Sequence, residues 1–236
     1  MFDKVVYINL DSRTDRKEQI ENELNKIGIT NYERFPAVKH DIPQVGCILS
    51  HLNVLKNARE KQYKNILILE DDFEFIVSKE EFWKQIEAIK DVDYDVIMLS
   101  YNLINSEEFN DTLFKVIDAH TTSGYLVNSR MYDSLINNYE EAAKILSETK
   151  DYSLHALDQY WKRLQPQHKW YGFKVRIGKQ RPSYSDLVGA DVDYKLGGKR
   201  RHYTRSKKHK RHIKRKGNKY AGKKLTRRAR NKAITF

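Results

Sequence analysis

The sequence is poor in three features, and each shortage excludes a class of protein. Its single cysteine, Cys47, excludes an internal disulfide framework and favours a reducing compartment. No apolar run approaches the roughly 18 residues that a membrane-spanning helix needs. No apolar signal-peptide segment follows Met1. We therefore predict a cytoplasmic protein without a transmembrane segment.

Acidic residues are also scarce, but only in the last part of the chain. Residues 195–236 contain 19 Lys or Arg and no Asp or Glu, although the whole chain has a net charge of only +12. The first 194 residues hold the other 25 basic residues and all 32 acidic residues, a net charge of −7. The basic segment has few aliphatic residues, so it cannot bury enough surface to fold alone. We predict a folded domain over residues 1–194 and a basic, disordered tail over 195–236.

Within residues 1–194, strand and helix patterns alternate. Residues 5–10, 66–69 and 94–99 are apolar enough to be buried strands, and amphipathic helical patterns separate them. Gly28 is a predicted helix stop, and Ser78 begins a capping-box pattern that opens another helix. This alternation predicts an α/β fold with a mostly parallel central sheet that helices cover on both faces.

Three consecutive carboxylates, Glu70, Asp71 and Asp72, follow the strand predicted at residues 66–69. In open α/β sheets, ligands bind beyond the carboxyl ends of the strands. Side chains alternate along a strand, so Glu70 and Asp72 can point to one side and Asp71 to the other. Converging carboxylates repel one another unless a cation or proton lies between them. The pattern predicts a Mg²⁺ or Mn²⁺ site that faces a diphosphate, and the alternative is a solvated acidic turn.

Further motifs surround these carboxylates, in the order VVYINLDSRTDR, FPAV, VGCILSHLNVLKNA, ILILEDDFEF, YDVIMLS, TTSGYLVNSRMYDSLI, LDQYW and GKQRPSYSDL. Together they resemble glycosyltransferase family 25, which includes bacterial lipooligosaccharide galactosyltransferases and procollagen galactosyltransferases. The resemblance covers residues 4–188 and leaves out the tail. It implies a GT-A-type, Rossmann-like nucleotide-sugar-binding domain. It also implies Mn²⁺ (or Mg²⁺), a UDP-galactose or UDP-glucose donor, and inverting transfer to a hydroxyl of a glycan or hydroxylysine-type acceptor.

The same resemblance suggests roles for four carboxylates. Glu70 and Asp72 stand at the family's DxD-like position and are the predicted metal ligands, whereas Asp71 would hold the ribose or a metal-bound water. Asp158, in LDQYW, matches the Asp of a late family motif and is the predicted general base. Its apolar and aromatic neighbours would raise its pKa toward neutrality, which suits a base. A helix-surface Asp or a structural ion pair is the alternative.

Polar residues near the first two helices are further candidates for donor binding. Asn9, Arg13 and Arg16 lie at or just past the end of the first predicted strand, where an Arg could clamp diphosphate oxygens. Surface charge or a structural ion pair is the alternative for the two arginines. Ser50 and His51 fall on the second predicted helix, where the alternative for His51 is a buried, hydrogen-bonded core histidine.

Two later segments complete the predicted donor pocket. Ser123 and Gly124 enter a short strand, where a glycine would let the backbone approach a sugar or phosphate. A simple bend is the alternative. Gln180, Ser185 and Asp186 belong to a late loop, and an ordinary solvated loop is the alternative there.

Cys47 has no partner pattern for a nucleophile in the sequence, and we interpret it as a packed core residue.

The tail suggests an alternative function of another class. Nineteen positive charges would bind polyanions with a steep dependence on salt. The protein would then bind nucleic acid or an anionic membrane surface through residues 195–236, or serve as a scaffold with an inactive transferase-like body. As an accessory role, the tail could tether an active enzyme to such a partner.

Overall fold

The computed structural model describes residues 2–185, 190–193 and 201–203, which lie within one compact unit, Met1–Thr204. Strand β13 (Arg201–Tyr203) pairs with β12 (Ala190–Asp193), so three residues of the predicted tail form a strand. The remainder of that tail lies outside the described residues, and its disorder stays a prediction. Among the helices that the structure describes, none is both long and apolar enough to cross a membrane.

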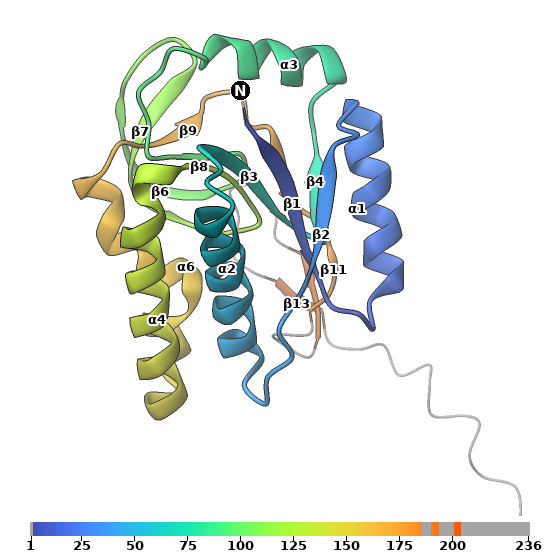
Figure 1. The fold of residues 1–236 in the computed structure, drawn as a ribbon, viewed down its shortest axis with the longest axis vertical. Helices are drawn as coiled ribbons and strands as arrows, with labels where there is room; N and C mark the ends of the chain where they lie inside the picture. Colours follow the sequence, from blue (N-terminus) through green and yellow to red (C-terminus); the bar gives the residue numbers. More distant parts are fainter. Residues whose placement is uncertain (1, 186–189, 194–200, 204–236) are drawn as a thin grey trace, which may run out of the picture. The chain divides into compact units, whose positions relative to one another are not determined.

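An eight-stranded sheet forms the centre of this unit, in the order β2-β1-β3-β8-β5-β9-β7-β6 (Figure 1). Its strands are β1 (Lys4–Asn9), β2 (Tyr32–Pro36), β3 (Asn65–Glu70), β5 (Val96–Met98), β6 (Asn102–Glu108), β7 (Leu113–His120), β8 (Gly124–Asn128) and β9 (Trp170–Phe173). Two small sheets join β4 (Phe73–Phe75) with β10 (Gly178–Gln180), and β11 (Ser183–Ser185) with β12 and β13.

The strand directions confirm the predicted class. Strand β1 is parallel to β2 and β3, and β5 is parallel to β9. Only β8 and β7 run against the other six strands, because each pairs antiparallel with its neighbours. The central sheet of the described residues is therefore mostly parallel, with two reversed strands.

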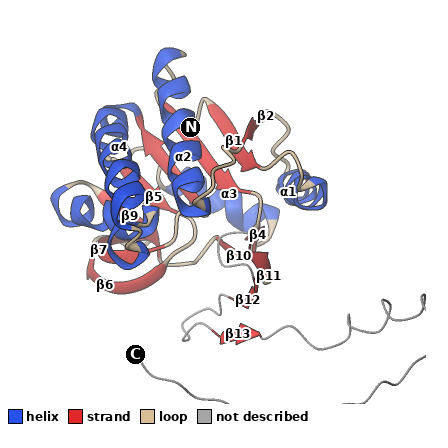
Figure 2. Ribbon diagram, turned by 90° about the horizontal axis from the view of Figure 1, so that it is seen from below, coloured by secondary structure: helices blue, strands red, loops and turns tan. Residues whose placement is uncertain are grey.

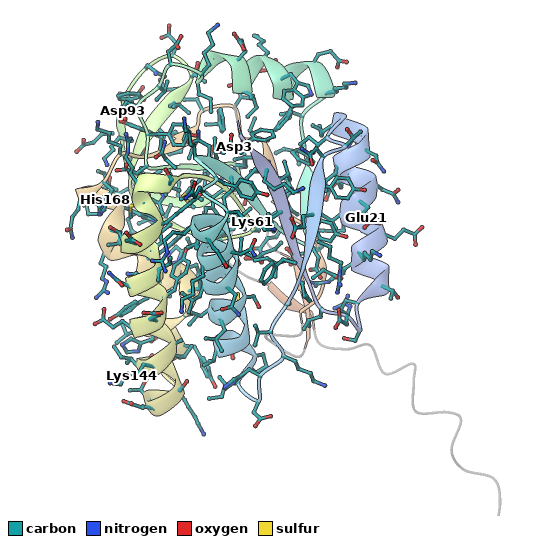
Figure 3. All side chains as sticks on the ribbon, viewed as in Figure 1. Asp3, Glu21, Lys61, Asp93, Lys144 and His168 are labelled. Carbon is teal, nitrogen blue, oxygen red and sulfur yellow. The ribbon has the colours of Figure 1, made fainter. Side chains whose placement is uncertain are left out.

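Helices cover both faces of the sheet, as the sequence predicted (Figures 1 and 2). The helices are α1 (Thr14–Ile27), α2 (Pro43–Glu60), α3 (Lys79–Ala88), α4 (Tyr132–Thr149), α5 (Tyr152–His155) and α6 (Leu157–Tyr160), with 3-10 turns at Ser129–Met131 and Trp161–Gln167. Helices α2 and α4 pack on one face and share one apolar cluster, and α1 and α3 share a second cluster on the other face. Figure 3 shows side chains filling the space between the sheet and these helices.

Strand β3 sits between these two clusters. Ile66 and Ile68 belong to the cluster of α2 and α4, whereas Leu67 and Leu69 belong to the cluster of α1 and α3. All four are at most 1% exposed, so the strand is buried on both faces as predicted. Its parallel register pairs Ile8 of β1 with Glu70, and this brings the carboxyl ends of the two strands together.

Local signals in the sequence set the ends of two helices, whereas a further helical pattern in the sequence is broken in the structure. Gly28 ends α1 in the left-handed conformation (φ 81°), which glycine adopts without strain. The Ser78 hydroxyl accepts a hydrogen bond from the Glu81 amide and caps α3. The helical pattern over residues 154–164 is interrupted, because Ala156 is extended (ψ 153°) between α5 and α6.

Candidate active site

A pocket of about 310 Å³ opens at the carboxyl ends of β1 and β3. The first turns of α2 also line it, through Pro43, Gly46 and Cys47. Predicted site residues make up much of the remaining wall: Asn9, Arg16, Ser50, His51, Glu70, Asp71, Asp72 and Gln180. The fold thus brings together residues that are up to 171 positions apart, at the edge where α/β sheets bind ligands.

Asp71 is held by two neighbours. Asn9 donates a hydrogen bond from Nδ2 to Oδ2 (2.8 Å), and Arg16 donates one from Nη1 to Oδ1 (2.8 Å). Burial raises the pKa of Asp71, and the charge of Arg16 opposes that rise. Because each carboxylate oxygen already has a partner, Asp71 mainly anchors Asn9 and Arg16 at the pocket.

Asp72 is buried with less compensation. Its Oδ2 lies 3.6 Å from Nη1 of Arg16, and its buried Oδ1 has no hydrogen bond to any residue that the structure describes. Burial, followed by the nearby charge of Glu70, raises the pKa of Asp72 to about 8. A second cation beside this carboxylate would stabilise its charged form, so Asp72 fits a divalent metal ion.

Glu70 points to the α2 side of the sheet. Its Oε1 accepts a hydrogen bond from the Thr122 hydroxyl (2.7 Å) and lies 3.3 Å from Nε2 of His51. Although burial opposes it, the contacts with His51 and Thr122 hold the pKa of Glu70 below its usual range. Glu70 therefore stays charged and places a negative charge on the wall of the pocket. His51 is itself fixed by the Tyr125 hydroxyl, 3.0 Å from its Nδ1.

The three carboxylates thus divide differently from the simple alternation expected of a strand. Asp71 and Asp72 share Arg16, and Glu70 contacts His51. Asp72 lies in the turn after β3, where strand alternation no longer applies. Glu70 and Asp72 still influence each other electrostatically, since the charge of Glu70 raises the pKa of Asp72.

Three other candidates have structural partners outside a ligand role. The Ser50 hydroxyl accepts a hydrogen bond from the Val38 amide (2.8 Å) and donates one to the Gly46 carbonyl (2.7 Å), which ties the β2–α2 loop to α2. Ser123 is fully buried, with its hydroxyl 2.5 Å from that of Ser100.

Arg13 forms an ion pair with Asp15 (2.9 Å) and does not line the pocket.

Gly124 is explained by packing in β8. A Cβ atom at this position would lie 2.4 Å from the ring of Phe73 and 3.2 Å from the Leu69 side chain. The absent side chain therefore lets Phe73 of β4 pack directly on β8. This contact needs a glycine whether or not a ligand binds nearby.

The late loop is described only in part. Gln180 ends β10, opposite Phe73 of β4, and lines the pocket. Ser185 is the last residue of β11, and Asp186 lies outside the described residues. The predicted roles of Ser185 and Asp186 stay predictions.

Asp158 lies in the first turn of α6, outside the pocket lining. Its Oδ2 accepts a hydrogen bond from the Thr121 amide (3.3 Å). Thr121 has a φ of 87°, which is a strained conformation for a β-branched residue. Strain of this kind is typical of functional sites. The charge of Asp158 contributes, after burial and Glu70, to raising the pKa of the Cys47 thiol. Asp158 therefore lies within electrostatic reach of the pocket wall.

Arg34 was not among the predicted site residues, but it helps to hold the site. Arg34 of β2 donates hydrogen bonds from Nε to Oδ1 of Asn9 (2.9 Å) and from Nη2 to its carbonyl (3.0 Å), which turns the Asn9 amide toward Asp71. The parallel pairing of β1 with β2 could have suggested this neighbour. Cys47 packs against the apolar cluster of α2 and α4, in agreement with its interpretation as a packed residue, and it also lines the pocket.

A pocket of carboxylates and cations at the carboxyl edge of an α/β sheet defines a site for a charged ligand. Residues 41–154 match the model of glycosyltransferase family 25, described as an LPS biosynthesis protein, and the predicted resemblance is confirmed. A glycosyltransferase 25 family member from Drosophila melanogaster is 28% identical over 165 residues, which are 53% of this chain and 26% of the relative. Procollagen galactosyltransferase 1-B from Xenopus laevis is 27% identical over 177 residues, 58% of this chain and 28% of the relative.

The chain spans about a quarter of the length of these curated relatives. Together with the family match, they support a glycosyltransferase. Similar solved structures include a glycosyltransferase involved in the glycosylation of the major capsid of PBCV-1. It has a TM-score of 0.45 and 10% identity, over 77% of this chain and 93% of that chain. A197 from STIV has a TM-score of 0.41 and 14% identity, over 72% and 80%. We infer no function from these two structures.

Proposed function

We propose that this protein is a metal-dependent, inverting glycosyltransferase that moves a hexose from a UDP-sugar to a hydroxyl acceptor. The observation that carries the proposal is Asp72, a buried carboxylate with an unpartnered oxygen, beside Glu70 and Arg16 in the pocket. Burial and the charge of Glu70 raise the pKa of Asp72 to about 8, so a cation beside it would favour its charged form. Oxygen ligands of this kind suit Mn²⁺ or Mg²⁺.

Several residues could hold the donor. Asp72 would be the first metal ligand and Glu70 the second, and a bound Mn²⁺ or Mg²⁺ would supply positive charge against the diphosphate. Arg16 lines the pocket beside both aspartates and would add a guanidinium to the same anion. The start of α2 also lines the pocket, and its first turn has no acidic residue, so its backbone dipole favours an anion.

Asp158 is the proposed general base. It would accept the proton of the acceptor hydroxyl as that oxygen attacks the anomeric carbon, and a single displacement inverts the configuration. Its hydrogen bond from the Thr121 amide supports this role, because it fixes the direction of the carboxylate. An Asp158→Asn change is expected to lower kcat by about 100-fold or more with little change in KM for the donor, measured by steady-state kinetics. A loss confined to KM would contradict the role of base.

The names of the relatives support a choice of sugar and acceptor. The name of the Xenopus laevis relative supports galactose and a procollagen-type acceptor, whereas the family description supports a lipopolysaccharide glycan. We therefore propose galactose or glucose as the sugar, and a glycan or hydroxylysine-type hydroxyl as the acceptor.

A donor screen tests the proposal. The full chain would be incubated with Mn²⁺ and UDP-, GDP- or CMP-sugars, with candidate acceptors, and nucleotide release would be measured. We expect release from one UDP-sugar, which EDTA and Asp72→Ala abolish. Asp133→Ala is the matched control, because Asp133 is exposed on α4, away from the pocket, where it pairs with Arg59. Release that survives both EDTA and Asp72→Ala would overturn the metal-dependent mechanism.

A further inference from the structure

Three side chains of different chemistry converge on one wall of the pocket. One ligand atom each from Cys47, His51 and Glu70 lies within 4.8 Å of the other two. Cys47 and His51 are four residues apart on α2, so they lie one above the other on the same helix face. Glu70 ends the neighbouring strand β3. The donor-binding role proposed above uses Glu70 but gives Cys47 no part.

A thiolate, an imidazole and a carboxylate form a ligand set that suits zinc. Mn²⁺ and Mg²⁺ prefer oxygen ligands, whereas Zn²⁺ binds Cys, His and Glu together. Ligand atoms around a tetrahedral Zn²⁺ are about 3.5 Å apart. Nε2 of His51 and Oε1 of Glu70 are already 3.3 Å apart, and the Cys47 sulfur lies within 4.8 Å of a ligand atom of each residue.

The neighbours of this cluster orient its ligands. The Tyr125 hydroxyl lies 3.0 Å from Nδ1 of His51 and can accept its proton, which leaves the lone pair of Nε2 for a metal. The Thr122 hydroxyl holds Oε1 of Glu70. Both partners are buried, at 0% and 6% exposure. All three ligands line the pocket, so an ion can enter and a fourth position faces the cavity.

We propose that Cys47, His51 and Glu70 bind one Zn²⁺ ion, with the fourth position open to the pocket. Binding replaces the S–H bond of Cys47 with a Zn–S bond and releases one proton to solvent. The site is separate in chemistry from the oxygen-ligand site at Asp72, but the two share Glu70. If the proposed function is correct, Zn²⁺ would withdraw Glu70 from the donor site and inhibit transfer.

Cobalt tests the site by a signal that does not depend on activity. Co²⁺ would be added to the full chain, and thiolate-to-cobalt charge-transfer absorption would be measured in the near ultraviolet. Cys47 is the only cysteine among the 236 residues, so this band can come from no other residue, although any of the eight histidines could bind the ion. We expect the band to saturate at one equivalent of Co²⁺ and to disappear when Zn²⁺ is added. The band should be absent in Cys47→Ser, and the affinity for Co²⁺ should be at least 10-fold weaker in His51→Ala.

His155→Ala is the matched control, because His155 lies on α5 and does not line the pocket. We expect this variant to keep the band. A second measurement needs no variant: Zn²⁺ should slow alkylation of Cys47 in the unaltered protein by at least 10-fold. Absence of the band, or a band of equal affinity in His51→Ala and Glu70→Gln, would overturn the site. Either result would leave the donor screen unaffected.

Discussion

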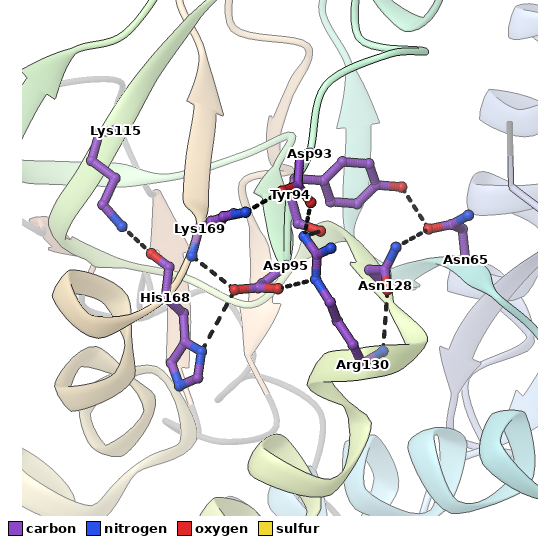
Figure 4. A network of polar contacts seen from close by, with 9 residues as sticks. All are labelled: Asn65, Asp93, Tyr94, Asp95, Lys115, Asn128, Arg130, His168 and Lys169. Atoms are coloured by element: carbon purple, nitrogen blue, oxygen red, sulfur yellow. Dashed lines mark hydrogen bonds and ion pairs between the residues drawn. The ribbon is translucent and has the colours of Figure 1, made fainter.

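Two aspartates with nearly equal burial lie at opposite ends of the strands of the central sheet, Asp95 at the amino ends and Asp72 at the carboxyl ends. Asp95 is 8% exposed and precedes β5, and Asp72 is 9% exposed and follows β3. Asp95 accepts hydrogen bonds from Nε of Arg130 and from the Lys169 amide (Figure 4). Asp72 has one oxygen near Arg16, and its other oxygen has no hydrogen bond within the described part of the chain.

The difference separates a structural carboxylate from a functional one. Asp95 ties the starts of β5 and β9 to the turn that precedes α4, and both of its oxygens have donors. The charged form of Asp72 costs stability, because its charge is buried without full compensation. A buried carboxylate that the fold leaves incompletely paired, at a ligand-binding edge, indicates a group kept for a ligand.

The largest expected effect is on activity. Asp72→Ala should lower the rate of donor turnover by at least about 100-fold, because it removes the metal ligand and the charge opposite Arg16. The measurement is kcat at saturating Mn²⁺, with circular dichroism to show that the variant is folded. Activity within threefold of the unaltered protein would show that Asp72 is not at the reacting centre.

The matching change at Asp95 should act on stability. Asp95→Ala removes one partner of Arg130 and the acceptor of the Lys169 amide, and we expect the free energy of unfolding to fall by about 3 kcal/mol. Urea unfolding measures this, and kcat at a temperature where the variant is folded should stay within about twofold. An unchanged urea midpoint would remove the contrast between the two aspartates.

The pH dependence of stability should show a smaller effect. Here a change at Asp72 relieves a loss of stability, whereas the change at Asp95 causes one. The pKa of Asp72 is raised from 3.8 to about 8 in the folded protein, so its contribution to stability is full below pH 4 and is lost as the pH rises through 8. In EDTA, Asp72→Asn should therefore flatten the fall in stability between pH 4 and 8. Thermal unfolding at several pH values checks this, and identical pH profiles for the two proteins would contradict it.

A change at a helix cap should have the smallest effect. Ser78→Ala removes the hydroxyl that accepts from the Glu81 amide at the start of α3, which is on the sheet face away from α2. We expect a loss of about 1 kcal/mol in the free energy of unfolding, measured in urea, and no change in kcat. A change in kcat would mean that α3 is coupled to the pocket.

The sequence predicted the elements that depend on local patterns. The apolar run of β3 and its carboxylate ending located the pocket edge, and Gly28 and Ser78 marked helix ends. Asn9 and Arg16 were predicted at the site because they lie at or just past the end of β1, whose carboxyl end lies beside that of β3.

Contacts between distant segments could not be predicted in the same way. Arg34 reaches Asn9 only through the pairing of β1 and β2, and Gly124 is required by the ring of Phe73. The break at Ala156, which separates α5 from α6, has no Gly or Pro signal in the sequence. Such features depend on tertiary packing, which a single sequence does not contain.

The most direct test of the central claim is the thermal stability of the protein with UDP and Mn²⁺, alone and together. The account expects UDP to raise the Tm of the unaltered protein only when Mn²⁺ is present, and to have no such effect on Asp72→Asn. Equal stabilisation of Asp72→Asn, or no stabilisation of the unaltered protein, would contradict a metal–diphosphate site at Asp72.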